Sequence, residues 1–190
     1  MNFLFSLSEN IAAIRHKSEA SVLFHLLEPR RNDVILHIGY NSGWIANQIA
    51  GICDDLYSLE PNEKHLHYVS VKYPQVKAFS ATEQSIPFSN NYFDKVCVVK
   101  SFHNFPDQDD TLEELRRILK PQGVLLINEI DVSRAGRTKS LSLFIEKRIL
   151  GHDTANHLTP SELQRLIESH GFKETKIQRS KQDYFLKAKK

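Results

Sequence analysis

The stretch VILHIGYNSGWIA, residues 34–46, predicts a buried strand that runs into a glycine turn and then into a helix. Val, Ile and Leu fill most of its first positions, as is typical of a strand covered on both faces. Gly39 follows the strand and Gly43 precedes the helix, where a residue without Cβ lets the backbone turn tightly and approach a ligand. We therefore predict a ligand-binding loop here, at the start of an α/β domain.

The rest of the chain alternates short β-rich segments with helix-periodic ones, which predicts a mainly parallel sheet wrapped by helices. We predict strands at Val34–Ile38, Leu56–Glu60, Val76–Phe79, Lys95–Val99, Val124–Glu129, Lys173–Ile177 and Tyr184–Ala188. We predict helices at Ser18–Leu27, Trp44–Cys53, Glu63–Lys72, Thr111–Leu119 and Pro160–His170. The last helix has capping signals at both ends, namely Thr159, Pro160, Glu162 and Gly171.

Length and composition predict one domain, residues 1–190, because 41% of the residues are hydrophobic and 25% are charged. A net charge of +2 is too balanced to predict a nucleic-acid partner or an anionic membrane. No apolar run is long enough to predict a membrane span, and the N-terminus lacks the basic start of a secretory signal. Cys97 stands in the apolar run KVCVVK, which predicts a reduced thiol and a cytoplasmic protein.

Glu60 indicates which kind of ligand the glycine turn would bind. It ends the second predicted strand about twenty residues after Gly39, where an acidic side chain can accept hydrogen bonds from both hydroxyls of a ribose. A dinucleotide normally needs a third glycine, and the turn GYNSGW has only two, so a nicotinamide-dependent oxidoreductase is disfavoured. A cofactor with a ribose but no phosphate fits this turn better.

Four segments, in this order, resemble the class I S-adenosylmethionine-dependent methyltransferases, of the compact type that includes the ubiquinone and menaquinone biosynthesis methyltransferases. They are VILHIGYNSGW, LYSLEPNEKHL, SATEQSIPFSNNYFDKVCVV and LEELRRILKPQGVLLINE. The resemblance runs from about Asp33 to Ile130 and weakly beyond. It implies a Rossmann-like α/β fold with a seven-stranded, mostly parallel sheet and helices on both faces. It also implies S-adenosylmethionine as cofactor and a small or medium-sized molecule as methyl acceptor.

The resemblance assigns cofactor-binding roles residue by residue. The methionine half of the cofactor would lie against His37, Gly39, Tyr40, Asn41, Ser42 and Gly43. The ribose and adenine would lie against Glu60, Pro61, Thr82 and Glu83, and the sulfonium would face Val99 and Lys100. The turn LKPQG would be structural, with Pro121 at its first bend and Gly123 at its exit.

At three positions the chain departs from the family pattern: His37 and Thr82 replace acids, and Asn41 replaces the middle glycine. A neutral imidazole still accepts one hydrogen bond, but a protonated one would repel the ammonium of the cofactor, so binding is expected to weaken at low pH. The other interpretation of His37 is a histidine at the edge of the core, satisfied by a backbone carbonyl. Together the departures keep open an alternative function, a non-catalytic relative that binds a nucleoside ligand or a protein partner.

Methyl transfer needs a general base only where the acceptor must lose a proton. The candidate base is His103, in KSFHNFPD after the fourth predicted strand; the alternative is a structural histidine packed against Phe102 and Phe105. Glu129 and Asp131 are weaker candidates, and the other interpretation takes them for exposed loop carboxylates.

No metal site is predicted. His65 and His67 are two positions apart on a predicted helix and so point to different faces. His152 and His157 lie with Asp153 in a polar loop without zinc-type spacing.

Two segments are expected to cover the carboxyl edge of the sheet, where ligands of open α/β sheets bind. They are an N-terminal helical cap, residues 1–32, and an insertion, residues 132–158. The insertion carries Phe144, Ile145, Ile149 and Leu150, which favours an apolar or amphipathic acceptor.

Overall fold

The computed structural model describes residues 20–39, 43–134 and 156–190. Three residues of the glycine turn, Tyr40, Asn41 and Ser42, therefore lie outside the described residues, as do most of the predicted N-terminal cap and of the predicted insertion. The apolar side chains expected to shape the acceptor site, residues 144–150, are outside them too.

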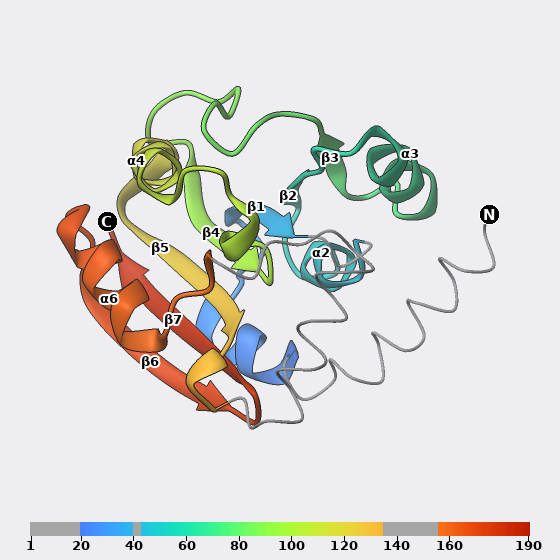
Figure 1. Ribbon diagram of the computed structural model, residues 1–190. Helices are drawn as coiled ribbons and strands as arrows, with labels where there is room; N and C mark the ends of the chain where they lie inside the picture. The colour runs from blue at the N-terminus through green and yellow to red at the C-terminus, as the bar shows by residue number, and fades with distance from the viewer. Residues whose placement is uncertain (1–19, 40–42, 135–155) are drawn as a thin grey trace.

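A seven-stranded sheet forms the centre of the molecule, in the order β3-β2-β1-β4-β5-β7-β6 (Figure 1). The strands are β1 (Val34–Gly39), β2 (Asp55–Leu59), β3 (Lys77–Phe79), β4 (Phe93–Val99), β5 (Leu119–Ile130), β6 (Lys173–Ser180) and β7 (Asp183–Lys189). The first five strands pair in parallel, and β7 runs antiparallel to both of its neighbours, β5 and β6. The predicted mostly parallel α/β sheet is confirmed.

Helices cover both faces of this sheet. Besides a helix at residues 20–27, they are α2 (Trp44–Ala50), α3 (Glu63–Lys72), α4 (Gln108–Ile118) and α6 (Pro160–Ser169). Two short 3-10 turns, η1 (Phe102–Asn104) and η2 (Val132–Arg134), follow β4 and β5. The capping box predicted for α6 is present, with the Thr159 side chain accepting from the backbone of Glu162 and Glu162 reaching back.

Because successive side chains of a strand point to opposite faces, the sheet separates two hydrophobic cores. Leu36 and Ile38 of β1 enter the core shared with α4 and α6. Ile35 enters the other core, which α2, α3 and the helix at residues 20–27 close. Buried side chains on both faces explain why β1, β4 and β5 are almost continuously apolar in the sequence.

The turn LKPQG lies within β5, which begins at Leu119 rather than at the predicted Val124. Gln122 after Pro121 has φ 65°, and the pairing with β4 changes register beside the turn. Gly123 is required for space: a Cβ there would lie 2.7 Å from the carbonyl oxygen of Lys120. The turn therefore forms a bulge that the strand continues through.

None of the described helices combines the length and the apolar character that crossing a bilayer requires.

Candidate functional site

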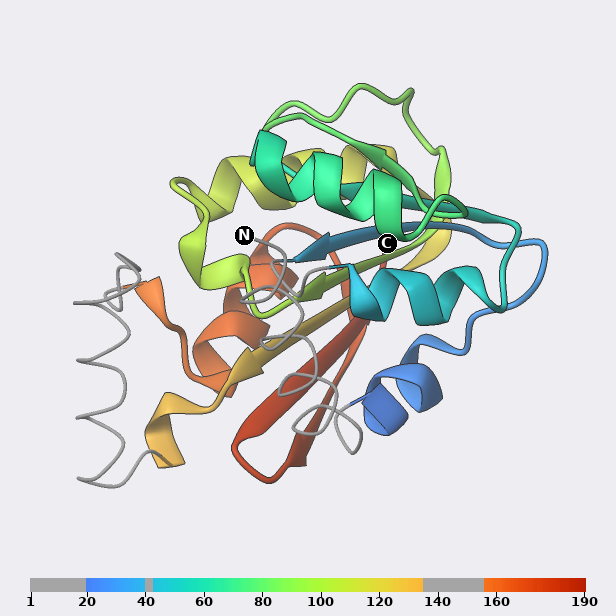
Figure 2. The same cartoon turned by 90° about the vertical axis from the view of Figure 1, so that its right-hand side faces the viewer.

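The carboxyl ends of β1, β4 and β5 lie along the same edge of the sheet (Figure 2). From β1 the chain crosses to β2 on one side, and β4 adds later on the other side. Such a reversal of strand order leaves a crevice outside the strand ends, which is the usual ligand site of open α/β sheets. Most of the predicted site residues lie at this edge.

The two glycines of the turn are required by the geometry on either side of the undescribed residues. A Cβ on Gly39 would lie 2.6 Å from the carbonyl oxygen of Val99 on the neighbouring strand. Gly43 begins α2 with φ 74°, a left-handed conformation that L side chains rarely adopt, and a Cβ there would meet Val69 at 2.9 Å. Neither position has room for a side chain.

A buried hydrogen-bonded chain joins the ends of β1 and β2. Nδ1 of His37 lies 3.2 Å from the hydroxyl of Ser58, which donates to Oε1 of Glu60 at 3.0 Å. His37 and Ser58 are fully buried and Glu60 is 3% exposed. Parallel pairing sets His37 directly beside Ser58, so the two strand ends bring together side chains that are distant in sequence. Ser58 was not among the predicted site residues, although its place two residues before the predicted acid was visible in the sequence.

Burial changes the charges of His37 and Glu60, the two titratable side chains of this hydrogen-bonded group. It lowers the pKa of His37 to about 4, because the imidazolium would lose its hydration. It raises the pKa of Glu60 to about 7, and the hydrogen bond from Ser58 offsets only part of that effect. His37 is thus neutral in mild acid, and the expected repulsion of an ammonium does not arise there. Nor does a backbone carbonyl satisfy Nδ1, since its partner is a side chain.

The remaining predicted cofactor residues occupy different environments. Glu83 is buried, whereas Pro61 and Thr82 are exposed. Val99 is buried beside Gly39 at the end of β4. Lys100 has φ 49° and directs its ammonium to Asp183, with Nζ 2.8 Å from Oδ2.

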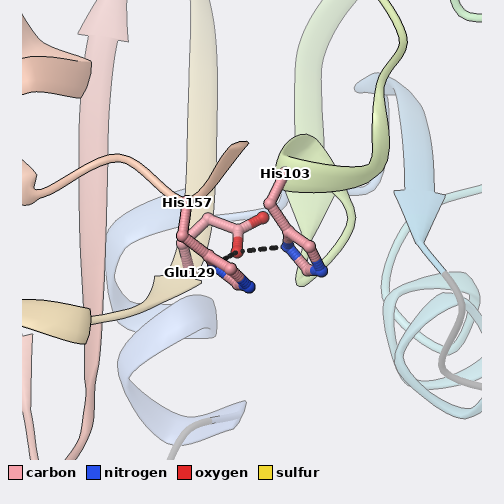
Figure 3. Close-up of side chains that lie close together, drawn as sticks. All are labelled: His103, Glu129 and His157. Atoms are coloured by element: carbon pink, nitrogen blue, oxygen red, sulfur yellow. Dashed lines mark hydrogen bonds and ion pairs between the residues drawn. The ribbon is translucent and has the colours of Figure 1, made fainter. Parts of the chain in front are cut away.

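A second group of side chains, His103, Glu129 and His157, meets further along the edge (Figure 3). Oε2 of Glu129 lies 2.8 Å from Nδ1 of His103 and 3.9 Å from Nδ1 of His157. Oε1 of Glu129 accepts a hydrogen bond of 2.8 Å from the backbone N–H of Phe102. Sequence reasoning found His103, but it considered His157, in the loop before α6, only as a metal ligand with His152 and Asp153 and not as a neighbour of His103.

Glu129 and Asp131 are 3% and 2% exposed, so their interpretation as exposed loop carboxylates is wrong. Both carboxylates are buried because β5 extends further than predicted beside β7. Glu129 still pairs with β7, and the backbone N–H of Asp131 donates to the carbonyl oxygen of Gln182. The antiparallel strand β7 pairs with the end of β5 and covers it. The prediction assumed instead that the chain left β5 for a solvent-exposed loop.

His103, Glu129 and His157 have the composition of a two-histidine, one-carboxylate metal site, and their ligand atoms lie within 4.8 Å of one another. The two imidazoles, however, are stacked, with centroids 4.0 Å apart and planes inclined by 17°. Since a ring nitrogen binds a metal in the plane of its ring, two nearly parallel rings do not direct their Nδ1 lone pairs to one point. The arrangement suits a histidine oriented by a carboxylate better. His152 and Asp153 lie outside the described residues.

Comparison with known proteins agrees with this geometry. Residues 36–127 match the family model described as a methyltransferase domain. A ubiquinone/menaquinone biosynthesis C-methyltransferase of Rickettsia prowazekii is 28% identical over 64% of this chain and 54% of that protein. A demethylmenaquinone methyltransferase of Lactobacillus johnsonii is 23% identical over 79% of this chain and 72% of that protein. The chain thus spans about half the length of the first of these relatives.

Solved structures share the fold. The crystal structure of an S-adenosylmethionine-dependent methyltransferase from Thermotoga maritima superposes with a TM-score of 0.70, at 18% identity over 94% of this chain and 98% of that one. The order of the strands, the matched domain and the curated relatives agree with one another: the chain is similar to the class I S-adenosylmethionine-dependent methyltransferases, and residues 36–127 match their methyltransferase domain.

Proposed function

We propose that this protein is a methyltransferase that binds S-adenosylmethionine and methylates a small or medium-sized, apolar acceptor. The observation that carries the proposal is the pair of buried side chains at the ends of β1 and β2, His37 and Glu60, beside Gly39, where the backbones of β1 and β4 approach closely. Buried polar groups at a strand end beside a glycine turn are costly to keep unless a ligand uses them.

The residues present fit this cofactor. Glu60 would accept hydrogen bonds from the ribose hydroxyls, and Nε2 of His37, which is buried and has no hydrogen-bond partner among the described residues, would accept one from the amino group. Glu83 would lie on the adenine side, with Pro61 and Thr82 at its exposed rim. When bound, the cofactor supplies a methyl group already activated by its sulfonium, so the protein mainly aligns the reactants and excludes water.

Lys100 would not repel the sulfonium strongly, because its charge is compensated. Its ammonium lies 2.8 Å from the carboxylate of Asp183, whose side chain is only 3% exposed. The pairing draws the lysine toward β7, while the carbonyl end of β4 at Val99 borders the glycine turn.

The names of the two relatives direct the first acceptor screen to quinones in their reduced form, since both relatives act in ubiquinone or menaquinone biosynthesis or on demethylmenaquinone. Methylation at carbon replaces a C–H bond by a C–C bond, and the proton released must go to a base. We assign that role to His103. Glu129 holds it: with Nδ1–H donated to the carboxylate, Nε2 keeps the lone pair that accepts the proton.

The alternative is a relative that binds a nucleoside ligand or a protein partner without chemistry. The exposed Thr82 and the neutral His37, at positions where the family pattern has acids, favour it. It predicts binding of S-adenosylhomocysteine with no turnover of S-adenosylmethionine against any acceptor.

Isothermal titration calorimetry with S-adenosylmethionine and S-adenosylhomocysteine tests the cofactor site. We expect dissociation constants on the order of micromolar for the wild type, and no measurable binding for Glu60→Ala. Glu113→Ala, which removes an exposed carboxylate of α4, is the matched control and should bind as the wild type does. No binding by the wild type would refute the proposed function. Formation of S-adenosylhomocysteine with a reduced quinone then separates the enzyme from the non-catalytic alternative.

We propose a cytoplasmic location as well, which Cys53 and Cys97 support because both are buried free thiols. The expected partner is the small-molecule acceptor, and the balanced charge of the chain gives no support to nucleic acid as a substrate.

A further inference from the structure

Ser58 is the junction between the two strand ends that would meet the cofactor. Its hydroxyl lies 3.2 Å from Nδ1 of His37 and 3.0 Å from Oε1 of Glu60, and it is completely buried. Neither the family match nor the proposed function gives this serine a role.

The number of available protons determines the donor and the acceptor in each of these two hydrogen bonds. A serine hydroxyl has one proton, and at pH values above the Glu60 pKa of about 7, where Glu60 is a carboxylate, Ser58 donates it to Glu60. Toward His37 the same oxygen can only accept, so Nδ1 of the imidazole must carry the proton. In a neutral imidazole the other nitrogen, Nε2, then holds a lone pair and no proton.

The surroundings keep the ring neutral. The residues that pair with His37 on the neighbouring strands are Ser58 on β2 and Cys97 on β4, and neither brings a charge to it at neutral pH. Burial holds the pKa of His37 far below its usual value, and burial likewise raises the pKa of the Cys97 thiol.

Nε2 of His37 is the last atom of this hydrogen-bonded chain, and its ring lies beside the glycine turn. The atom is buried and has no hydrogen-bond partner among the described residues. The adjoining ring carbon, Cε1, would lie 3.4 Å from a Cβ on Gly39, so the ring borders the glycine turn. A buried acceptor without a donor is unfavourable in the ligand-free protein, and a ligand with an N–H group would satisfy it.

We propose that Ser58 is a positioning residue that holds His37 in the Nδ1–H tautomer, so that Nε2 receives the amino group of the cofactor as a neutral hydrogen-bond acceptor. This inference rests on the proposed function and adds its recognition rule. The site recognises the amino-acid half of the ligand by a hydrogen bond to neutral His37, whose tautomer Ser58 of β2 determines. A buried carboxylate at the position of His37 is not needed.

Wild-type protein alone gives the first test. In the ligand-free protein labelled with nitrogen-15, the histidine nitrogen spectrum should show His37 with a protonated Nδ1 and an unprotonated Nε2 at mildly alkaline pH, where Glu60, with a pKa of about 7, is a carboxylate. An Nε2–H tautomer would overturn the inference without any variant. The spectrum of Ser58→Ala should contain both tautomers, and Ser58→Thr, which keeps a hydroxyl on a strand, should restore one.

Two ligands separate a role through His37 from one through Glu60. S-adenosylhomocysteine has the amino-acid half, whereas 5′-methylthioadenosine has only the ribose and adenine. By calorimetry, Ser58→Ala should weaken binding of S-adenosylhomocysteine about tenfold more than binding of 5′-methylthioadenosine, the loss of one hydrogen bond to a charged group. Ser58→Thr should restore most of that difference.

The outcomes are distinguishable. Equal weakening of both ligands would mean that Ser58 acts only through Glu60 or through the fold, and would overturn this inference while leaving the proposed function intact. Failure of the wild type to bind either ligand would refute the proposed function itself and this inference with it.

Discussion

The carboxylate of Glu129 lies 2.8 Å from Nδ1 of His103, although 26 residues separate them in the chain. The parallel pairing of β4 with β5 creates this contact, because η1 follows β4 directly and Glu129 stands near the end of β5. The backbone N–H of Phe102 holds the other carboxylate oxygen, so both partners are fixed before a substrate arrives.

If His103 accepts a proton from the acceptor, His103→Gln should lower the turnover rate by about 10²–10⁴-fold, the usual contribution of a general base. Affinity for S-adenosylhomocysteine should stay unchanged, because His37 and Glu60, which would hold the cofactor, lie at the ends of β1 and β2. The measurement is the rate of S-adenosylhomocysteine formation with the best acceptor of the quinone screen. His67→Gln, on the exposed side of α3, is the control. A variant with wild-type turnover would leave His103 a structural residue.

The two glycines that border the turn should tolerate no side chain. Gly39→Ala places a methyl group 2.6 Å from the carbonyl oxygen of Val99, so we expect a loss of stability of about 1–3 kcal/mol and loss of cofactor binding. Gly51→Ala is the matched control, because Gly51 has φ −72° and a conformation open to alanine. Urea unfolding and calorimetry measure the two effects, and equal stability of both variants would contradict the close approach.

Affinity for S-adenosylhomocysteine should depend on pH through Glu60. The pKa of this group is about 7 in the ligand-free protein, and ribose hydroxyls donate to the carboxylate form. Affinity should therefore be level above pH 7 and fall up to about tenfold for each pH unit below it. Calorimetry in buffers of different ionisation enthalpy should also detect proton release on binding near pH 7. The variant Glu60→Gln should bind more weakly and without this dependence; a wild-type affinity that is level from pH 5 to 8 would contradict the prediction.

His37 and Glu60, which both hydrogen-bond to Ser58, should make the free energy of unfolding depend on pH in opposite directions. Burial raises the pKa of Glu60 from 4.5 to about 7, so the folded state binds the proton more tightly and gains stability as the pH falls through that window. Burial lowers the pKa of His37 from 6.5 to about 4, so the unfolded state binds the proton more tightly and stability is lost as the pH falls. In the wild type the two contributions nearly cancel.

Single variants uncover each contribution. Compared with the wild type, His37→Gln should become more stable as the pH falls from 7 to 4.5, and Glu60→Gln should become less stable, each by up to roughly 3 kcal/mol. Urea unfolding at several pH values measures both, and the other titrating groups are common to all three proteins. Slopes of the same sign in the two variants would show that at least one of these groups is not perturbed as the geometry requires.

Much of the fold could be predicted because its signals are local. Continuous apolar runs marked β1, β4 and β5, and the capping box of α6 was legible in the four residues that begin it. The start of β5 was less accessible, because a proline and a positive φ at Gln122 usually end a strand, and only pairing with β4 carries it through the turn.

The sequence by itself determined the elements, the glycine turn at Gly39 and Gly43, and the acid Glu60, since each depends on neighbours in the chain. Only the tertiary structure decided that Ser58 joins His37 to Glu60, that His157 stacks on His103, and that Glu129 is buried. These contacts depend on strand order and register, which set residues from distant segments side by side and remove water from them. Removal of water also determines the charges of His37 and Glu60, and that effect cannot be read from residue types alone.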